Sequence, residues 1–177
     1  MRGRYPIVEH RELRPWWRWS AWRERRRPLV AGRGQVLVHV VDEMYGSGTA
    51  DPARCTAMTL VNVRPGRLVS AHWELTAAGS DWDFPVTATF RCTVVDPVAV
   101  ARSRRTGAPW DVKYVLWQYN RPWQLNREHP VGDEDGLRLA LTTRLQARPV
   151  HREIAGVRVE LEEVSVGSAR FVSVADA

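Results

Sequence analysis

The stretch from Phe84 to Val95 constrains the fold more than any other part of the chain. Up to Val94, apolar residues at even positions alternate with mostly Thr and Arg at odd positions. This period of two is typical of a strand with one buried and one exposed face. Asp96 and Pro97 follow, and Asp is a favoured helix N-cap residue while Pro fits the first helical position. A strand, a sharp stop and a helix together indicate an α+β fold.

The same kind of pattern predicts the remaining elements. A nearly continuous apolar run predicts a covered strand at 35–41, and a second strand is predicted at 57–63. Alternation predicts strands at 69–75 and 157–161, and a phase shift near Glu162 indicates a bulge. Arg64-Pro65-Gly66-Arg67 is typical of a type II turn within an antiparallel meander. Helical spacing predicts helices at 111–119 and 137–145. We therefore expect one α+β domain, an antiparallel or mixed β-sheet with two or three helices packed on it, and an edge strand near Phe171.

Charge is distributed unevenly along the chain. Residues 1–33 contain ten Arg against three Glu, whereas the whole chain has a formal net charge of +6. The remainder is therefore close to neutral, which favours an N-terminal arm that meets phosphate, anionic lipid or an acidic partner. We divide the chain into an Arg/Trp-rich arm, residues 1–33, and a domain, residues 34–177. Pro15 and Pro28 bracket a short predicted helix in the arm.

The candidate binding residues all lie in this arm and are either aromatic or cationic. They are Trp16, Trp17, Arg18, Trp19, Trp22, Arg23, Arg25, Arg26 and Arg27. Three interpretations remain open. Trp at headgroup depth with Arg on anionic lipid indicates a peripheral membrane contact. Arg on phosphates with Trp stacked on bases indicates nucleic acid. In the third interpretation, the Trp side chains pack on the body of the protein or on a partner, either another protein or a second copy.

The rest of the sequence predicts no catalytic, metal or cofactor site. Cys92 is expected to be a buried thiol on the apolar face of its strand. The acids from Asp133 to Asp135 are expected to begin a helix, where they stabilise the dipole. Glu160 and Glu162 are expected on a solvated strand face. A core position is expected for five of the nine Trp, namely Trp73, Trp82, Trp110, Trp117 and Trp123.

The cellular setting expected from the sequence is cytoplasmic, at the inner face of the membrane. Cys55 and Cys92 are too few for a disulfide framework. No apolar segment predicts a signal peptide or a membrane-spanning helix.

Three linked elements resemble the SPFH domain, also called the band 7 or stomatin–prohibitin–flotillin domain. They are the strand that ends in Asp-Pro and leads to a helix (residues 86–101), the helix at 137–145, and the closing strand entered through Gly156. The turn at residues 63–66 also resembles an early strand pair of that family, so the likeness covers about residues 35–166. The resemblance implies a non-enzymatic, membrane-associated scaffold that oligomerises and has no catalytic residues. We therefore expect a scaffold or adaptor that docks through its arm on an anionic membrane surface; the alternative is an adaptor whose arm binds a protein or nucleic acid.

Overall fold

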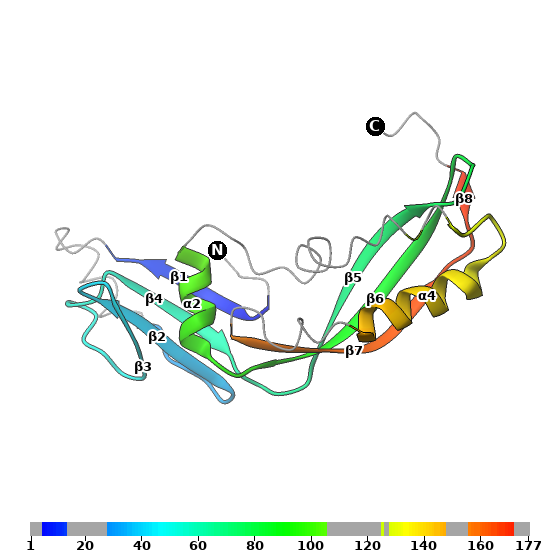
Figure 1. The fold of residues 1–177 in the computed structure, drawn as a ribbon. Helices are drawn as coiled ribbons and strands as arrows, with labels where there is room; N and C mark the ends of the chain where they lie inside the picture. Colours follow the sequence, from blue (N-terminus) through cyan, green and yellow to red (C-terminus); the bar gives the residue numbers. More distant parts are fainter. Residues whose placement is uncertain (1–4, 14–27, 106–124, 126–127, 148–155, 172–177) are drawn as a thin grey trace. The chain divides into compact units, whose positions relative to one another are not determined.

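A computed structural model of the chain describes residues 5–13, 28–105, 125, 128–147 and 156–171 (Figure 1). The chain divides into two compact units. The first unit comprises Met1–Gly66, Thr93–Trp110 and Glu153–Arg158, and the second comprises Arg67–Cys92, Asp111–Arg152 and Val159–Ala177. The described residues form two antiparallel sheets and two helices, which confirms the predicted α+β class.

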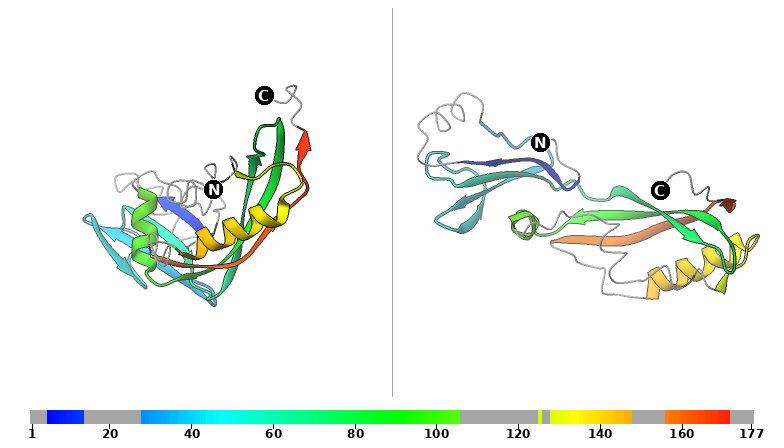
Figure 2. Two further views of the ribbon diagram at one scale, coloured as in Figure 1. Left: turned by 45° about the vertical axis from the view of Figure 1, so that its right-hand side comes forward. Right: turned by 90° about the horizontal axis from the view of Figure 1, so that it is seen from above.

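The first unit is built on a four-stranded sheet. Its strands are β1 (Ile7–Glu12), β4 (Ala57–Asn62), β2 (Gln35–Val41) and β3 (Met44–Ser47), in that spatial order, and every neighbouring pair is antiparallel (Figure 2). Leu37 lies opposite Leu60 in the register, so these two side chains share one face. Val38 lies opposite Thr59 on the other face. Both faces carry buried side chains, which is why β2 and β4 lack a clean apolar–polar alternation.

The helix α2 (Pro97–Arg105) packs on this first sheet, against β2, β3 and β4. It begins as the sequence predicts: Asp96 Oδ1 accepts hydrogen bonds from the N–H groups of Val98 (2.8 Å) and Ala99 (3.0 Å). Val100 is completely buried. The Gly156 carbonyl accepts from Asp96 N at 3.0 Å. Gly156 has a φ of +80°, and a Cβ there would collide with the Asp96 carbonyl oxygen, so only glycine fits.

The second sheet consists of β5 (Arg67–Thr76), β6 (Trp82–Val94) and β7 (Val157–Val166), with β8 (Arg170–Phe171) paired to the start of β6. Burial alternates along β5 from Val69 onward and along β6 from Phe84 onward, so even and odd positions lie on different faces as predicted. In β7 the buried positions change from Val157 and Val159 to Val164. This change of phase matches the one expected near Glu162.

The second helix, α4 (Glu134–Ala147), belongs to the second unit and lies beside its sheet (Figures 1 and 2). Leu137 and Leu141, one turn apart, are both buried. Asp133 precedes the helix, and its backbone carbonyl accepts from Leu137 N at 3.0 Å. The predicted helix start at the acidic run is therefore confirmed.

The division into two sheets differs from the single sheet that the sequence predicts. The turn at Arg64-Pro65-Gly66 connects β4 in the first sheet to β5 in the second, and it does not join two paired strands. A short strand, β3, lies between the predicted strands at 35–41 and 57–63, where no element was predicted. Residues 7–12, assigned to the arm by composition, form β1 and pair with β4. The predicted helix at 111–119 lies outside the described residues.

The Asp96 cap is expected to contribute measurably to stability. Replacing it by Ala leaves the N–H groups of Val98 and Ala99 without their acceptor, and we expect a loss of about 1 kcal/mol in the free energy of unfolding. Urea denaturation measures this loss as a lower midpoint at constant slope. Asp96→Asn keeps an acceptor oxygen and serves as the control. Equal destabilisation by both substitutions would contradict the capping role.

Candidate functional site

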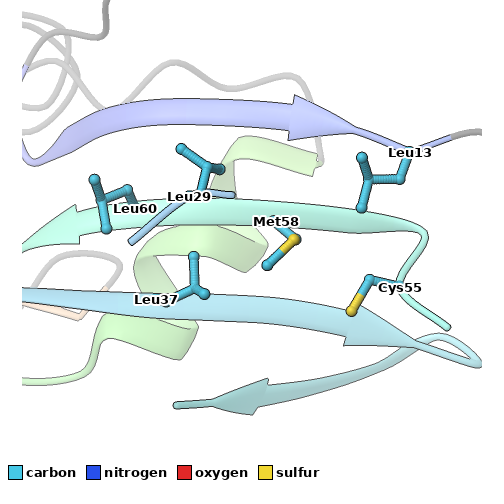
Figure 3. Packing of buried hydrophobic residues seen from close by; sticks show 6 residues of the cluster. All are labelled: Leu13, Leu29, Leu37, Cys55, Met58 and Leu60. Carbon is cyan, nitrogen blue, oxygen red and sulfur yellow. The ribbon is translucent and has the colours of Figure 1, made fainter. Parts of the chain in front are cut away.

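The residues predicted to bind a partner lie together in one segment of the chain. Trp16, Trp17, Arg18, Trp19, Trp22, Arg23, Arg25, Arg26 and Arg27 all fall within 14–27, outside the described residues. The structure does describe the two ends of this Arg/Trp segment, Leu13 and Leu29. Both ends lie in one buried cluster of the first unit, with Leu37, Cys55, Met58 and Leu60 (Figure 3).

The two ends are fixed by backbone pairing and by burial. β1 pairs with β4 up to Glu12, and Leu13 N then donates to the Thr56 carbonyl at 2.8 Å. Leu13 is 9% exposed and Leu29 is 6% exposed. The chain thus enters and leaves the Arg/Trp segment at one apolar cluster. The residues on both sides of the segment are therefore held in the first unit, with β1 before the segment and β2 after it.

A histidine occupies the other face of the first sheet, beneath α2. His10 Nδ1 lies 2.8 Å from Thr59 Oγ1, and Thr59 is itself buried. Burial lowers the pKa of His10, and the positive charge of Arg104 lowers it further, while Glu12 acts in the opposite direction. The low pKa favours the neutral imidazole at physiological pH. His10 is therefore suited to a buried hydrogen bond rather than to a charged binding site.

Both thiols are buried and are poor nucleophiles. Cys55 is 1% exposed, and its Sγ lies 3.3 Å from the Asp51 carbonyl oxygen; burial raises its pKa, with a smaller effect of Asp51 in the same direction. Cys92 is completely buried, as predicted, and burial raises its pKa to about 12. Because the thiolate is the reactive form, neither side chain is prepared for covalent chemistry.

Some of the acidic side chains singled out in the sequence have structural partners. His129 Nδ1 lies 2.7 Å from Asp133 Oδ2 at the start of α4. Glu162 makes a two-point ion pair with Arg91, at 2.6 and 2.9 Å, and these hydrogen bonds lower the pKa of Glu162. Glu160 is exposed on its strand, as predicted. Within the described residues, no three His, Cys, Asp or Glu side chains come together as metal ligands.

One surface feature was missed by the sequence prediction. Trp73 is buried as expected, but Trp82 is 41% exposed, so its predicted core position is wrong. Its ring makes an edge-to-face contact with Phe171, which is 62% exposed, with 5.9 Å between ring centroids and 73° between planes. Trp82 shares the strand phase of buried Phe84, but it is the first residue of β6, where the core ends. Periodicity gives the face of a side chain but not the limit of the core.

Comparisons with known proteins add no family to this description. No protein-family model matches the chain, and no curated protein is significantly similar to it. Among the described residues, no helix has the length and apolar character needed to cross a membrane.

We expect the folded protein to resist thiol labelling at pH 8. The pKa of Cys92 rises from 9.0 to about 12, which lowers its thiolate fraction roughly a thousandfold relative to the unfolded chain. Labelling with Ellman's reagent, with and without urea, measures the difference, and Cys55→Ala leaves Cys92 as the single thiol. Rapid labelling of that variant in its folded state would contradict the burial of Cys92.

The raised pKa of Cys92 also predicts that the stability of the fold decreases as pH rises. The folded thiol keeps its proton to a higher pH than the unfolded thiol does. The contribution of the buried Cys92 thiol to the free energy of unfolding is therefore complete below about pH 9 and is lost as pH rises toward 12. Urea midpoints at pH 8 and pH 10 test this, and the fall between them is expected to be smaller in Cys92→Ala.

Proposed function

We propose that this protein is a non-catalytic scaffold of the SPFH type that docks peripherally on the anionic cytoplasmic face of a membrane. The contact is made by the Arg/Trp segment, through Trp16, Trp17, Arg18, Trp19, Trp22, Arg23, Arg25, Arg26 and Arg27. The observation that carries the proposal is the anchoring of both ends of this segment, Leu13 and Leu29, in one buried cluster. A segment whose two flanks are held in a fold loses less conformational freedom on binding than a free tail does.

The composition of the segment suits an anionic interface. It contains six Arg and four Trp against one Glu. Each Arg near a negatively charged lipid surface contributes about 1 kcal/mol, and Trp rings prefer the depth of the lipid headgroups. Charge alone gives weak and salt-sensitive attachment to a membrane. Charge combined with the insertion of aromatic rings makes two independent contributions to the free energy of binding.

The local geometry at the elements that carry the SPFH resemblance supports the scaffold part of the proposal. The strand β6 ends at a capped helix, α2, through Asp96. Gly156 leads into β7 and accepts from Val95 N at 2.8 Å. Helix α4 precedes that strand along the chain. These are the same three elements, in the same order, on which the resemblance rests.

Vesicle flotation with the full chain tests the proposal. We expect flotation with vesicles of anionic lipid but not with neutral vesicles, and a decline as salt is raised. Changing Arg25, Arg26 and Arg27 to Glu is expected to weaken binding at least about a hundredfold, at about 1 kcal/mol for each lost Arg. Changing the four Trp of the segment to Ala is expected to abolish flotation. Substitution is preferable to deleting residues 1–33, which would remove β1 and Leu29 from the first unit.

The matched control has the same change of net charge at another place. Arg54, Arg67 and Arg158 are exposed and lie outside the segment, so changing all three to Glu keeps the segment intact. Equal loss of flotation in this control would make net charge, rather than the segment, responsible and would contradict the proposal. If the wild-type chain does not float, the adaptor alternative is tested by adding duplex and single-stranded DNA, where binding would fall steeply with salt.

A further inference from the structure

One end of the second unit combines exposed aromatic rings with acidic side chains. Trp82 and Phe171 are register partners where β6 meets β8, and their rings are in contact. Asp81 precedes Trp82 and is exposed, and Asp83 follows it. Figures 1 and 2 show that the turn between β5 and β6, the strand β8 and the chain leading into α4 come together at this end.

Hydrogen bonds connect these segments. Ala77 N donates to the Trp82 carbonyl at 2.7 Å and closes the turn, and Ala78 N donates to the His129 carbonyl at 2.9 Å. Exposed Glu128 is therefore held beside the turn that carries Asp81. We define the aromatic–acidic patch as four exposed residues: Asp81, Trp82, Glu128 and Phe171.

The charge balance around the patch is strongly negative. Asp133, Glu134 and Asp135 follow Glu128 at the start of α4, and Arg138 pairs with Asp135 at 3.0 Å. Arg170 stands opposite Asp83 in the β6–β8 register. The described residues of this end thus carry six carboxylates against Arg170 and Arg138. Such a surface repels anionic lipid and attracts a cationic partner.

We propose that the aromatic–acidic patch of one copy of this chain binds the Arg/Trp segment, residues 14–27, of a second copy. The segment has the complementary charge, with six Arg against one Glu. A guanidinium stacks on the exposed face of a Trp or Phe ring and at the same time donates to a neighbouring carboxylate. The patch offers both a ring and carboxylates, because exposed Asp81 directly precedes Trp82 and exposed Glu128 is held beside the same turn.

The contact is heterologous, because it joins two different surfaces of the same chain. Each copy therefore has one patch and one segment to offer, and association continues from copy to copy or closes into a ring. The contact does not depend on the proposed membrane docking. The two would nevertheless compete, since lipid and patch engage the same Arg side chains.

The test measures self-association of the full chain by analytical ultracentrifugation across protein concentration and salt. We expect wild-type association to weaken with salt. Asp81→Lys with Glu128→Lys, or Trp82→Ser with Phe171→Ser, is expected to weaken it at least about tenfold. Circular dichroism melting identifies variants that fail to fold. Matched controls are Glu74→Lys with Glu163→Lys, both exposed carboxylates elsewhere in the unit, and Met44→Ser with Leu139→Ser, both exposed apolar side chains.

A charge exchange makes the test specific. A chain with Arg25, Arg26 and Arg27 changed to Glu, and a chain with Asp81 and Glu128 changed to Lys, are each expected to lose self-association. Mixed together, they are expected to associate, because the intact segment of the second chain meets the intact patch of the first and the reversed segment meets the reversed patch. Failure of the mixture to associate would overturn the proposal, as would a wild-type chain that stays monomeric up to about 100 µM in low salt.

Flotation separates this inference from the proposed function. The Lys variants of the patch keep the Arg/Trp segment, so they are expected to float with anionic vesicles as the wild type does. If the Trp82→Ser and Phe171→Ser variant lost flotation while keeping self-association, the patch would be a lipid contact and the proposal would be wrong. Loss of flotation by the wild type would leave the self-association test unaffected.

Discussion

The second sheet depends on β6, because this strand is hydrogen-bonded to all of its other strands. β5 pairs with it over ten register positions, β8 pairs at its start, and β7 lies along its other edge. Its buried face runs from Phe84 to Val94, and Phe84, Ala88 and Cys92 have no exposed area. A strand buried in this way tolerates little change of side-chain volume, since each cavity costs both transfer free energy and lost contacts. The register of one strand thus fixes the positions of three others.

Opposite the core, the second sheet carries polar side chains that satisfy one another. Ser70 pairs with Thr89 at 3.1 Å, His72 with Thr87 at 2.9 Å, and Arg91 with Glu162. A partner that covered this face would have to displace these contacts without gaining much apolar area. The aromatic pair at the end of the sheet is different, because Trp82 and Phe171 leave apolar ring surface in water. The end of the sheet therefore offers a partner apolar surface that the polar face lacks.

Local patterns in the sequence predict local structure well here. The strand at Phe84, the cap at Asp96, the helix at Leu137 and the change of phase in β7 all follow from short-range rules of periodicity and capping. Which strands share a sheet is a matter of long-range pairing, so the sequence predicts one sheet where there are two. β1 is a six-residue edge strand whose second half is rich in Glu and Arg, which hides its pairing with β4. For the candidate site, composition identifies the Arg/Trp segment, but the anchoring of its ends by Leu13 and Leu29 depends on tertiary packing that no local pattern encodes.

The ion pair between Arg91 and Glu162 joins residues that are 71 positions apart. β5 and β6 meet across a short turn and can pair as soon as both have been synthesised. β7 cannot join them until the chain between Val95 and Gly156 has been made, which takes the ribosome about 3 to 12 s at typical elongation rates. During this interval one edge of β6 has unsatisfied backbone groups and an apolar face. The nascent chain therefore passes through a stage in which a chaperone or a neighbouring nascent chain can reach this edge of β6 before β7 does.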